Sequence, residues 1–335
     1  MKLLMTIKKL LIFILLIMMP VCAVAADSST KAKEKLTKEQ EKLTKEQEKV
    51  TQEANSYYNQ GVRSLKEGQK DNAISNYSKA IELNPAFSEA YYYRGYIYSD
   101  MGRDDEAIAD FSKAIEINPG YKDAYARRGN IYYNLGNQPG VKIEVNQTES
   151  QNGTKDIRIR KKNKDEYYDL AILDFSKAIE IDPANKETYL NRGYAYNNKK
   201  QFDLGIADFN KVLELDPASS MAYLGLGHIY SNKREYNTAI ANYNKVIELD
   251  PAAANAYKFR GKVYNEKGED DKAIADFSKA IELDPKDHDA YFSRAMVYYV
   301  KEDFQKAWDD AKMAQSMGEV IEQEVLDEFR SSAGK

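Results

Sequence analysis

Proline recurs at a fixed spacing over most of the chain. Pro85, Pro119, Pro183, Pro217, Pro251 and Pro285 are separated by 34, 64, 34, 34 and 34 residues. A constant period of this length is typical of an array of repeated units, each of which packs only on its neighbours. The one irregular separation exceeds the period by 30 residues, so we expect an insertion inside one unit.

Each unit contains two amphipathic segments. The first has the pattern Tyr91-x-x-x-Gly95-x-x-Tyr98, and the second runs from Ala107 to the proline at 119. Apolar residues at three- and four-residue spacing predict helices, and proline ends the second helix because it cannot continue it. The first tyrosine of the pattern is present in seven copies, at Tyr57, Tyr91, Tyr125, Tyr189, Tyr223, Tyr257 and Tyr291.

This pattern closely resembles the tetratricopeptide repeat (TPR), over about residues 54–319. The chain is similar to secreted bacterial members of that family. The resemblance implies an all-α fold, a right-handed superhelical solenoid of seven helix-turn-helix repeats over 54–318. It also implies that partners bind a concave groove lined by the first helices. Mapped onto this chain, the groove offers Tyr92, Tyr96, Asn130, Tyr133, Tyr194, Asn197, His228, Asn265 and Tyr299.

The first 25 residues have the pattern of a secretory signal peptide. Three lysines precede the apolar run Leu10–Met19, and Ala23-Val24-Ala25 follows, which predicts cleavage after Ala25. We expect an exported protein of the periplasm or the extracellular space, with association with the envelope possible. The apolar run is too short to span a bilayer comfortably, so membrane contact would require an uncleaved or lipidated N-terminus. Met19-Pro20-Val21 before Cys22 does not fit a lipidation signal.

Charge and cysteine content exclude several classes of function. Loss of the three signal lysines changes the formal net charge from −4 to −7, which disfavours nucleic-acid binding. Cys22 is the only cysteine, so the mature chain has no disulfide and no thiolate ligand.

Two segments flank the predicted repeats. Residues 26–53 form a charged helical stalk with Leu36, Leu43 and Val50 seven residues apart. One apolar residue per heptad makes a weak coiled-coil seam, so a solvated helix is favoured over an oligomerising one. Residues 319–335 are interpreted as a C-terminal capping helix and tail, because arrays need a polar outer cap for solubility.

The insertion in repeat three spans 137–166. Apolar residues alternate over Val141–Val145 and Ile157–Ile159, which predicts a small β-hairpin. A hairpin with Val145 opposite Ile157 keeps these residues on one face, whereas a two-residue turn at Asn152-Gly153 would not. A disordered loop is the other interpretation. A basic cluster, Arg158, Arg160, Lys161 and Lys162, ends this segment.

We found no constellation of catalytic residues and no metal-ligand spacing. His228 and His288 are isolated from each other, and no phosphate loop, nucleophile elbow or dinucleotide fingerprint occurs. We therefore expect no enzymatic activity, no cofactor and no metal.

An internal covariation links two positions of each repeat. Five repeats have arginine before the repeat glycine and aspartate sixteen places later, once the insertion is discounted: Arg94 and Asp110, Arg128 and Asp174, Arg192 and Asp208, Arg260 and Asp276, Arg294 and Asp310. The other two have Gln60 with Asn76 and Leu226 with Asn242. We interpret the pattern as ion pairs between the two helices. A row of carboxylates for a ligand is the alternative.

The expected function is a protein–protein interaction scaffold or adaptor, exported to a bacterial envelope and binding a segment of a protein or peptide partner in the groove. The alternative is a binder of anionic polymer or lipid head groups through the basic insertion. The family also contains a lysine and asparagine clamp for a terminal carboxylate. Lys258 and Lys262 occur here without the matching asparagines, so that ligand is not supported.

Overall fold

The computed structural model describes residues 30–138, 143–149, 155–161 and 163–334. The chain forms two compact units, Met1–Ala124 and Tyr125–Lys335, and the boundary between them lies near the start of α6. The predicted signal peptide lies outside the described residues.

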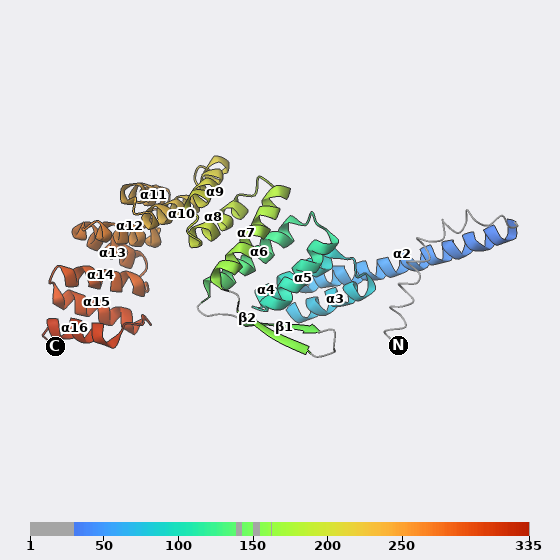
Figure 1. The fold of residues 1–335 in the computed structure, drawn as a ribbon, viewed down its shortest axis with the longest axis horizontal. Coiled ribbons are helices and arrows are strands. Elements are labelled where there is room, and N and C mark those ends of the chain that lie inside the picture. Colours follow the sequence, from blue (N-terminus) through green and yellow to red (C-terminus); the bar gives the residue numbers. More distant parts are fainter. Residues whose placement is uncertain (1–29, 139–142, 150–154, 162, 335) are drawn as a thin grey trace. The chain divides into compact units, whose positions relative to one another are not determined.

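The first unit consists of helices that pack in consecutive pairs (Figure 1). Its elements are α2 (Thr30–Lys66), α3 (Lys70–Leu83), α4 (Ser88–Asp100), α5 (Asp104–Ile117) and the first residues of α6 (Lys122–Asn137). The C-terminal part of α2 and α3 form repeat one, and α4 and α5 form repeat two. We refer to the first helix of each repeat as its A helix and to the second as its B helix.

The second unit continues with the same paired packing. Its elements are the rest of α6, β1 (Ile143–Glu149), β2 (Lys155–Lys161), α7 (Lys164–Ile181), α8 (Lys186–Asn198), α9 (Phe202–Leu215), α10 (Ser220–Asn232), α11 (Tyr236–Leu249), α12 (Ala254–Glu266), α13 (Asp270–Leu283), α14 (His288–Val300), α15 (Phe304–Ser316) and α16 (Gln323–Ser332). Helices α6 and α7 are repeat three, and the four following pairs are repeats four to seven. The all-helical repeat architecture predicted from the period is therefore present.

A left-handed residue ends most A helices. In repeat two Gly102 has φ 70°, and in repeats four and five the same position is held by Lys200 and Arg234 at φ 58° and 61°. In repeat two the amide of Arg103 donates to the carbonyl of Tyr98, which satisfies a carbonyl that the helix end leaves unpaired. These A helices thus turn sharply into their B helices.

The repeat glycine makes room for an aromatic ring of the B helix. A Cβ on Gly227 would lie 2.4 Å from the ring of Tyr243, a distance that no side chain tolerates without displacement. Repeat seven has Ala295 in place of the glycine, and both Ala295 and Ala311 of its B helix are fully buried. Ala311 stands where the other repeats have the aromatic ring. The larger residue at the glycine position is therefore matched by a smaller one on the B helix, which keeps the two helices closely packed.

The insertion forms an antiparallel two-stranded ladder. Val145 pairs with Ile159 and Gln147 with Ile157, so the predicted pairing of Val145 with Ile157 is wrong by two residues. Pairing of odd positions with odd positions was predicted correctly, and it places the apolar positions on one face of the ladder. The observed register leaves two more residues between Val145 and its partner than the predicted register did.

The insertion is shorter than its predicted span of 137–166. Helix α6 extends to Asn137, and α7 begins at Lys164. Asn163 caps α7 by accepting a hydrogen bond from the amide of Glu166, and the Tyr168 hydroxyl donates to the side chain of Asn137. The segment outside the helix pair is therefore 138–163.

The flanking segments are helical. From Thr30 onward the stalk and the first A helix are one continuous helix, α2, and full burial begins at Ala54. Leu43 and Val50 are half-exposed. At the other end, Leu326 and Phe329 of α16 are buried against Ala295 and Ala311. Within the described ranges, none of the helices combines the length and apolar character that a membrane crossing requires.

Candidate functional site

The arginine and aspartate that covary form a bidentate ion pair between the A and B helices. Arg94 Nε lies 2.7 Å from Asp110 Oδ2, and Arg94 Nη2 lies 2.7 Å from Asp110 Oδ1. The same geometry recurs in four sister pairs, Arg128–Asp174, Arg192–Asp208, Arg260–Asp276 and Arg294–Asp310. Matching forks of donors and acceptors make this the strongest form of charged hydrogen bond.

Each of four arginines also reaches the preceding repeat. Arg94 Nη1 donates to the hydroxyl of Ser78 at 2.8 Å, and Arg260 Nη1 donates to the side-chain oxygen of Asn244. Arg192 and Arg294 contact Ser176 and Ser278 in the same way. The arginine therefore joins three helices, which couples neighbouring repeats as well as the two helices of one repeat.

These carboxylates are not available to a ligand. The aspartate side chains retain between 2% and 11% of their exposure. Burial raises the pKa of Asp174, although hydrogen bonds and charge from Arg128 lower it. For Arg94 burial lowers the pKa, but the bonds and charge of Asp110 outweigh it, so its pKa lies above the ordinary value. The geometry supports ion pairing over the alternative of a ligand-binding row.

The predicted groove residues of the second unit lie on consecutive A helices, on a surface that we call the A-helix face. Three of these residues take part in a ladder of side-chain hydrogen bonds. Asn191 donates to Asn130 at 2.9 Å, and Asn232 donates to Asn197 at 3.1 Å. Asn198 donates to Asn137 at 3.0 Å and lies 3.5 Å from the Tyr133 hydroxyl. Polar groups of three successive repeats are thereby held in register.

Two further groove residues are more buried than the sequence suggested. The Tyr194 hydroxyl donates to the carbonyl of Met221, and its ring packs edge-on against Phe209. His228 lies 4.4 Å from the ring of Phe259, and its buried Nε2 has no hydrogen-bond partner. Desolvation by burial lowers the pKa of His228 to about 4. These two side chains therefore pack beneath the A-helix face and are less accessible to a partner.

The end of the array differs from its middle. Asn265 is exposed, whereas Tyr299 is covered by α16, since it stacks on Phe329 at 4.8 Å and donates to Glu328. Lys258 and Lys262 pair with Asp287 and Asp289 of the next repeat, at 2.7 Å and 2.8 Å. The two lysines are thus paired with carboxylates of the chain itself.

In the first unit the groove residues Tyr92 and Tyr96 are half-buried. Tyr92 stacks on Tyr121 with a centroid distance of 4.8 Å, and Tyr96 packs against the core between repeats one and two. The sequence did not single out Tyr93 and Tyr121, which pack on Tyr92, or Tyr58 and Phe87, which continue the chain of rings beyond Tyr93. The high tyrosine content of the chain was a sequence signal for this cluster, because four of the five residues, counting Tyr92, are tyrosines.

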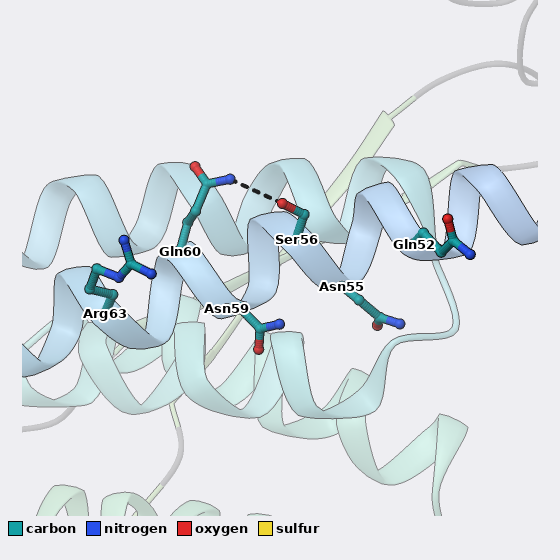
Figure 2. Close-up of a pocket in the computed structure, with 6 residues that line it drawn as sticks. All are labelled: Gln52, Asn55, Ser56, Asn59, Gln60 and Arg63. Atoms are coloured by element: carbon teal, nitrogen blue, oxygen red, sulfur yellow. Dashed lines mark hydrogen bonds between the residues drawn. The ribbon is translucent and has the colours of Figure 1, made fainter.

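A shallow hollow lies on one face of α2 (Figure 2). It is lined by Gln52, Asn55, Ser56, Asn59, Gln60 and Arg63. In repeat two the corresponding positions include Ala90 and Ile97, which are fully buried against repeat one. The polar face of α2 is therefore the outer surface of a terminal repeat, as solubility requires. Gln60 stands on this face at the position of the repeat arginine.

The backbone pairing of the hairpin shows where three residues of the basic cluster lie. Arg158 and Arg160 of β2 pair with Asn146 and Glu144 of β1, whereas Lys161 pairs with Ile143. Lys162 lies outside the described residues. Over the described parts of the chain, no group of three His, Cys, Asp or Glu residues is arranged to hold a metal ion.

Comparison with known proteins agrees with the geometry. A family model described as tetratricopeptide repeat matches residues 88–121, 187–219 and 220–252, and one described as TPR repeat matches 64–102 and 261–301. No curated protein matches the chain in sequence.

Several solved structures share the fold. A tetratricopeptide repeat protein from Parabacteroides merdae ATCC 43184 is 20% identical, with a TM-score of 0.61 over 85% of this chain and 100% of that one. A chain of the APC/C hetero-tetramer Cut9-Hcn1 is 16% identical, with a TM-score of 0.57 over 80% and 48%. Yeast Tom70 is 20% identical, with a TM-score of 0.50 over 91% and 58%.

At these identities the likeness concerns the fold, while the family models match the repeats themselves. Together with the helix pairs and their glycine-to-aromatic packing, these findings establish that the chain belongs to the tetratricopeptide repeat family.

Proposed function

We propose that the protein is a scaffold or adaptor, exported to a bacterial cell envelope, that holds a segment of a protein partner on its A-helix face. The TPR family and the absence of any convergent reactive pair on this face support a binding role over a catalytic one. The observation that carries the proposal is the hydrogen-bond ladder of Asn130, Asn191, Asn197 and Asn232.

This ladder suits a peptide backbone. A carboxamide has two N–H donors and an oxygen that accepts two hydrogen bonds, so one bond to a neighbouring asparagine leaves capacity for another partner. The bonds also restrict the side chains before a partner arrives, which lowers the entropy cost of binding. An extended segment with alternating carbonyl and amide groups matches amides held at successive repeats.

Export rests on the first 25 residues. Their order of basic, apolar and small residues is that of a secretory signal. The mature chain would contain no cysteine and would be stabilised without disulfides, so its stability would not depend on the redox state of its compartment.

Partner capture followed by footprinting tests the proposal. Mature protein, residues 26–335, would be used to capture partners from an envelope extract, and the captured partner would be purified and bound again. Hydrogen exchange should then slow in α8 and α10. Protection confined to B helices such as α9 and α11 would place the partner elsewhere and contradict the proposal.

A second candidate is an anionic-polymer or lipid-head-group binder, supported by the hairpin register. Arg158 and Arg160 occupy alternate positions of β2, so they lie on the same face of the ladder, opposite the face of Val145 and Ile159. Steep weakening of binding with salt would support this function, because exposed charge contacts are screened. Binding to anionic vesicles that does not change with salt, or that survives Arg158→Gln with Arg160→Gln, would exclude it.

A further inference from the structure

Five aromatic rings form a continuous strip on repeats one and two and the residue just before α6. The ring centroids of Phe87 and Tyr58 are 4.9 Å apart, and those of Tyr58 and Tyr93 are 6.0 Å apart. The strip continues from Tyr93 to Tyr92 at 5.2 Å and from Tyr92 to Tyr121 at 4.8 Å. We call these residues the aromatic strip. All five side chains are half-buried, so each ring packs on the protein and keeps part of its surface open.

At two positions of the strip, the aromatic residue is a poor choice for the stability of the helix that follows it. Phe87 is the N-cap residue of α4 and makes no capping bond, and Tyr121 immediately precedes α6. At the same place, repeats four, five and seven have Asn185, Ser219 and Asp287, whose side chains each accept a bond from a helix amide, whereas Ala253 of repeat six does not. Residues of that kind are preferred at N-caps. Repeats two and three therefore give up a stabilising bond for an aromatic surface.

Carboxylates accompany the rings. Glu89 is exposed and close enough to raise the pKa of both Tyr58 and Tyr121, after the larger effects of burial and neighbouring tyrosines. Asp123 is exposed at the position of α6 that corresponds to Glu89 in α4. Rings with acidic neighbours favour cations, which aromatic faces also attract.

We propose that the aromatic strip binds a proline-rich segment that carries lysine or arginine. Proline-rich chains adopt the polyproline II helix, with three residues per turn and no internal hydrogen bonds, and they dock in aromatic-lined grooves at low entropy cost. In a segment of repeated Pro-Pro-Lys, one edge presents prolyl rings to the strip and another presents ammonium groups to Glu89. This inference rests on the proposed function and specifies the partner chemistry for the first unit.

The test is a calorimetric titration of mature protein with three synthetic peptides of equal length. One repeats Pro-Pro-Lys, one repeats Pro-Pro-Glu, and one repeats Gly-Ser-Lys. The Pro-Pro-Lys peptide should bind more tightly than either of the others by about tenfold or more. Equal binding of Gly-Ser-Lys would show that charge alone is recognised, and equal binding of Pro-Pro-Glu would show that Glu89 is irrelevant. Either result overturns the inference.

Variants test the strip itself. Tyr121→Asn removes a ring and introduces the residue that caps α8 in repeat four, so the fold should be kept. It should weaken Pro-Pro-Lys binding by about tenfold, as should Glu89→Gln. Ala253→Asn makes the matching change at the N-cap of α12 and should leave the affinity unchanged.

Unchanged affinity of Tyr121→Asn, with the helical spectrum intact, would overturn the inference. So would a parent protein that binds none of the three peptides. Neither result affects the proposed scaffold function, because partner capture and footprinting on α8 and α10 do not depend on proline.

Discussion

Arg94 and Asp110 face each other across the two helices of repeat two with two hydrogen bonds of 2.7 Å each. The Asp110 side chain retains 8% of its exposure and the Arg94 side chain 19%. Removing one partner of such a pair leaves a buried charge without compensation, whereas replacing both by neutral groups can cost little. We therefore expect a large loss of stability when only one residue of the pair is replaced, and a smaller loss when both are replaced.

Loss of the arginine alone should destabilise the first unit. We predict that Arg94→Leu lowers its free energy of unfolding by about 3 kcal/mol or more, and that adding Asp110→Asn restores part of the loss. Repeat five provides the template, because Leu226 stands there with Asn242, which bonds the carbonyl of Thr238 instead. A double-mutant cycle from urea unfolding measures the coupling, and additive effects of the two changes would contradict the account.

The buried histidine makes the second unit sensitive to acid. The pKa of His228 is lowered from 6.5 to about 4, so between these values the unfolded chain binds a proton that the folded chain does not. The free energy of unfolding should fall as pH drops through this window, by about 3 kcal/mol in total for this residue.

His228→Met isolates the effect, since Met296 occupies the same position in repeat seven. Urea midpoints measured at intervals from pH 7 to pH 4 should fall less steeply for this variant than for the parent. Parallel curves would show that His228 does not titrate in the predicted window.

Helix α16 should protect repeat seven. Phe329 is buried and stacks on Tyr299, and the only tryptophan, Trp308, packs against the same cluster. Phe329→Ala should loosen α16, because truncating a buried phenylalanine costs about 3–5 kcal/mol. Trp308 emission should shift to the red and α16 should become more open to proteolysis. Val320→Ala is the control, since Val320 is 93% exposed, and an unchanged Trp308 spectrum in Phe329→Ala would refute the capping role.

The insertion should be dispensable for folding. Deletion of 139–162 keeps Asn137 and Asn163, which bond Tyr168 and cap α7. Loop length affects stability weakly, by about 0.6 kcal/mol per doubling, so we expect the same helical spectrum and a similar melting temperature. Binding to anionic vesicles, if the hairpin mediates it, should be lost. An unfolded deletion variant would show that the hairpin belongs to the core.

The repeat architecture and the ion pairs follow from regularities within the sequence. The proline period predicted the helix pairs, and covariation between Arg94 and Asp110 across copies pointed to their contact. The second bond of Arg94, to Ser78 of the preceding repeat, could not be inferred in this way. The acceptor is a serine or an asparagine in every repeat that an arginine contacts, so this position shows no covariation that would reveal the contact.

Features that depend on tertiary burial were harder to predict. The position of His228 holds residues of different character in other repeats, such as Val62, Lys262 and Met296. The burial of His228 depends on Phe259 of the next repeat. Likewise, alternation of apolar residues determined the parity of the hairpin but not the pairing of Val145 with Ile159, because register also depends on the length of the connecting loop.

The central claim is that a partner binds the A-helix face, and the most direct test is the affinity of a captured partner for two matched double variants. Asn197→Ala with Asn265→Ala removes amides from that face in repeats four and six. Lys211→Ala with Lys279→Ala changes half-exposed residues on the B helices of the same repeats, where each lysine bonds the glutamate three residues on. The account predicts that the asparagine variant binds about tenfold more weakly while the lysine variant binds like the parent. Equal affinity of parent and asparagine variant, or a loss confined to the lysine variant, would contradict it.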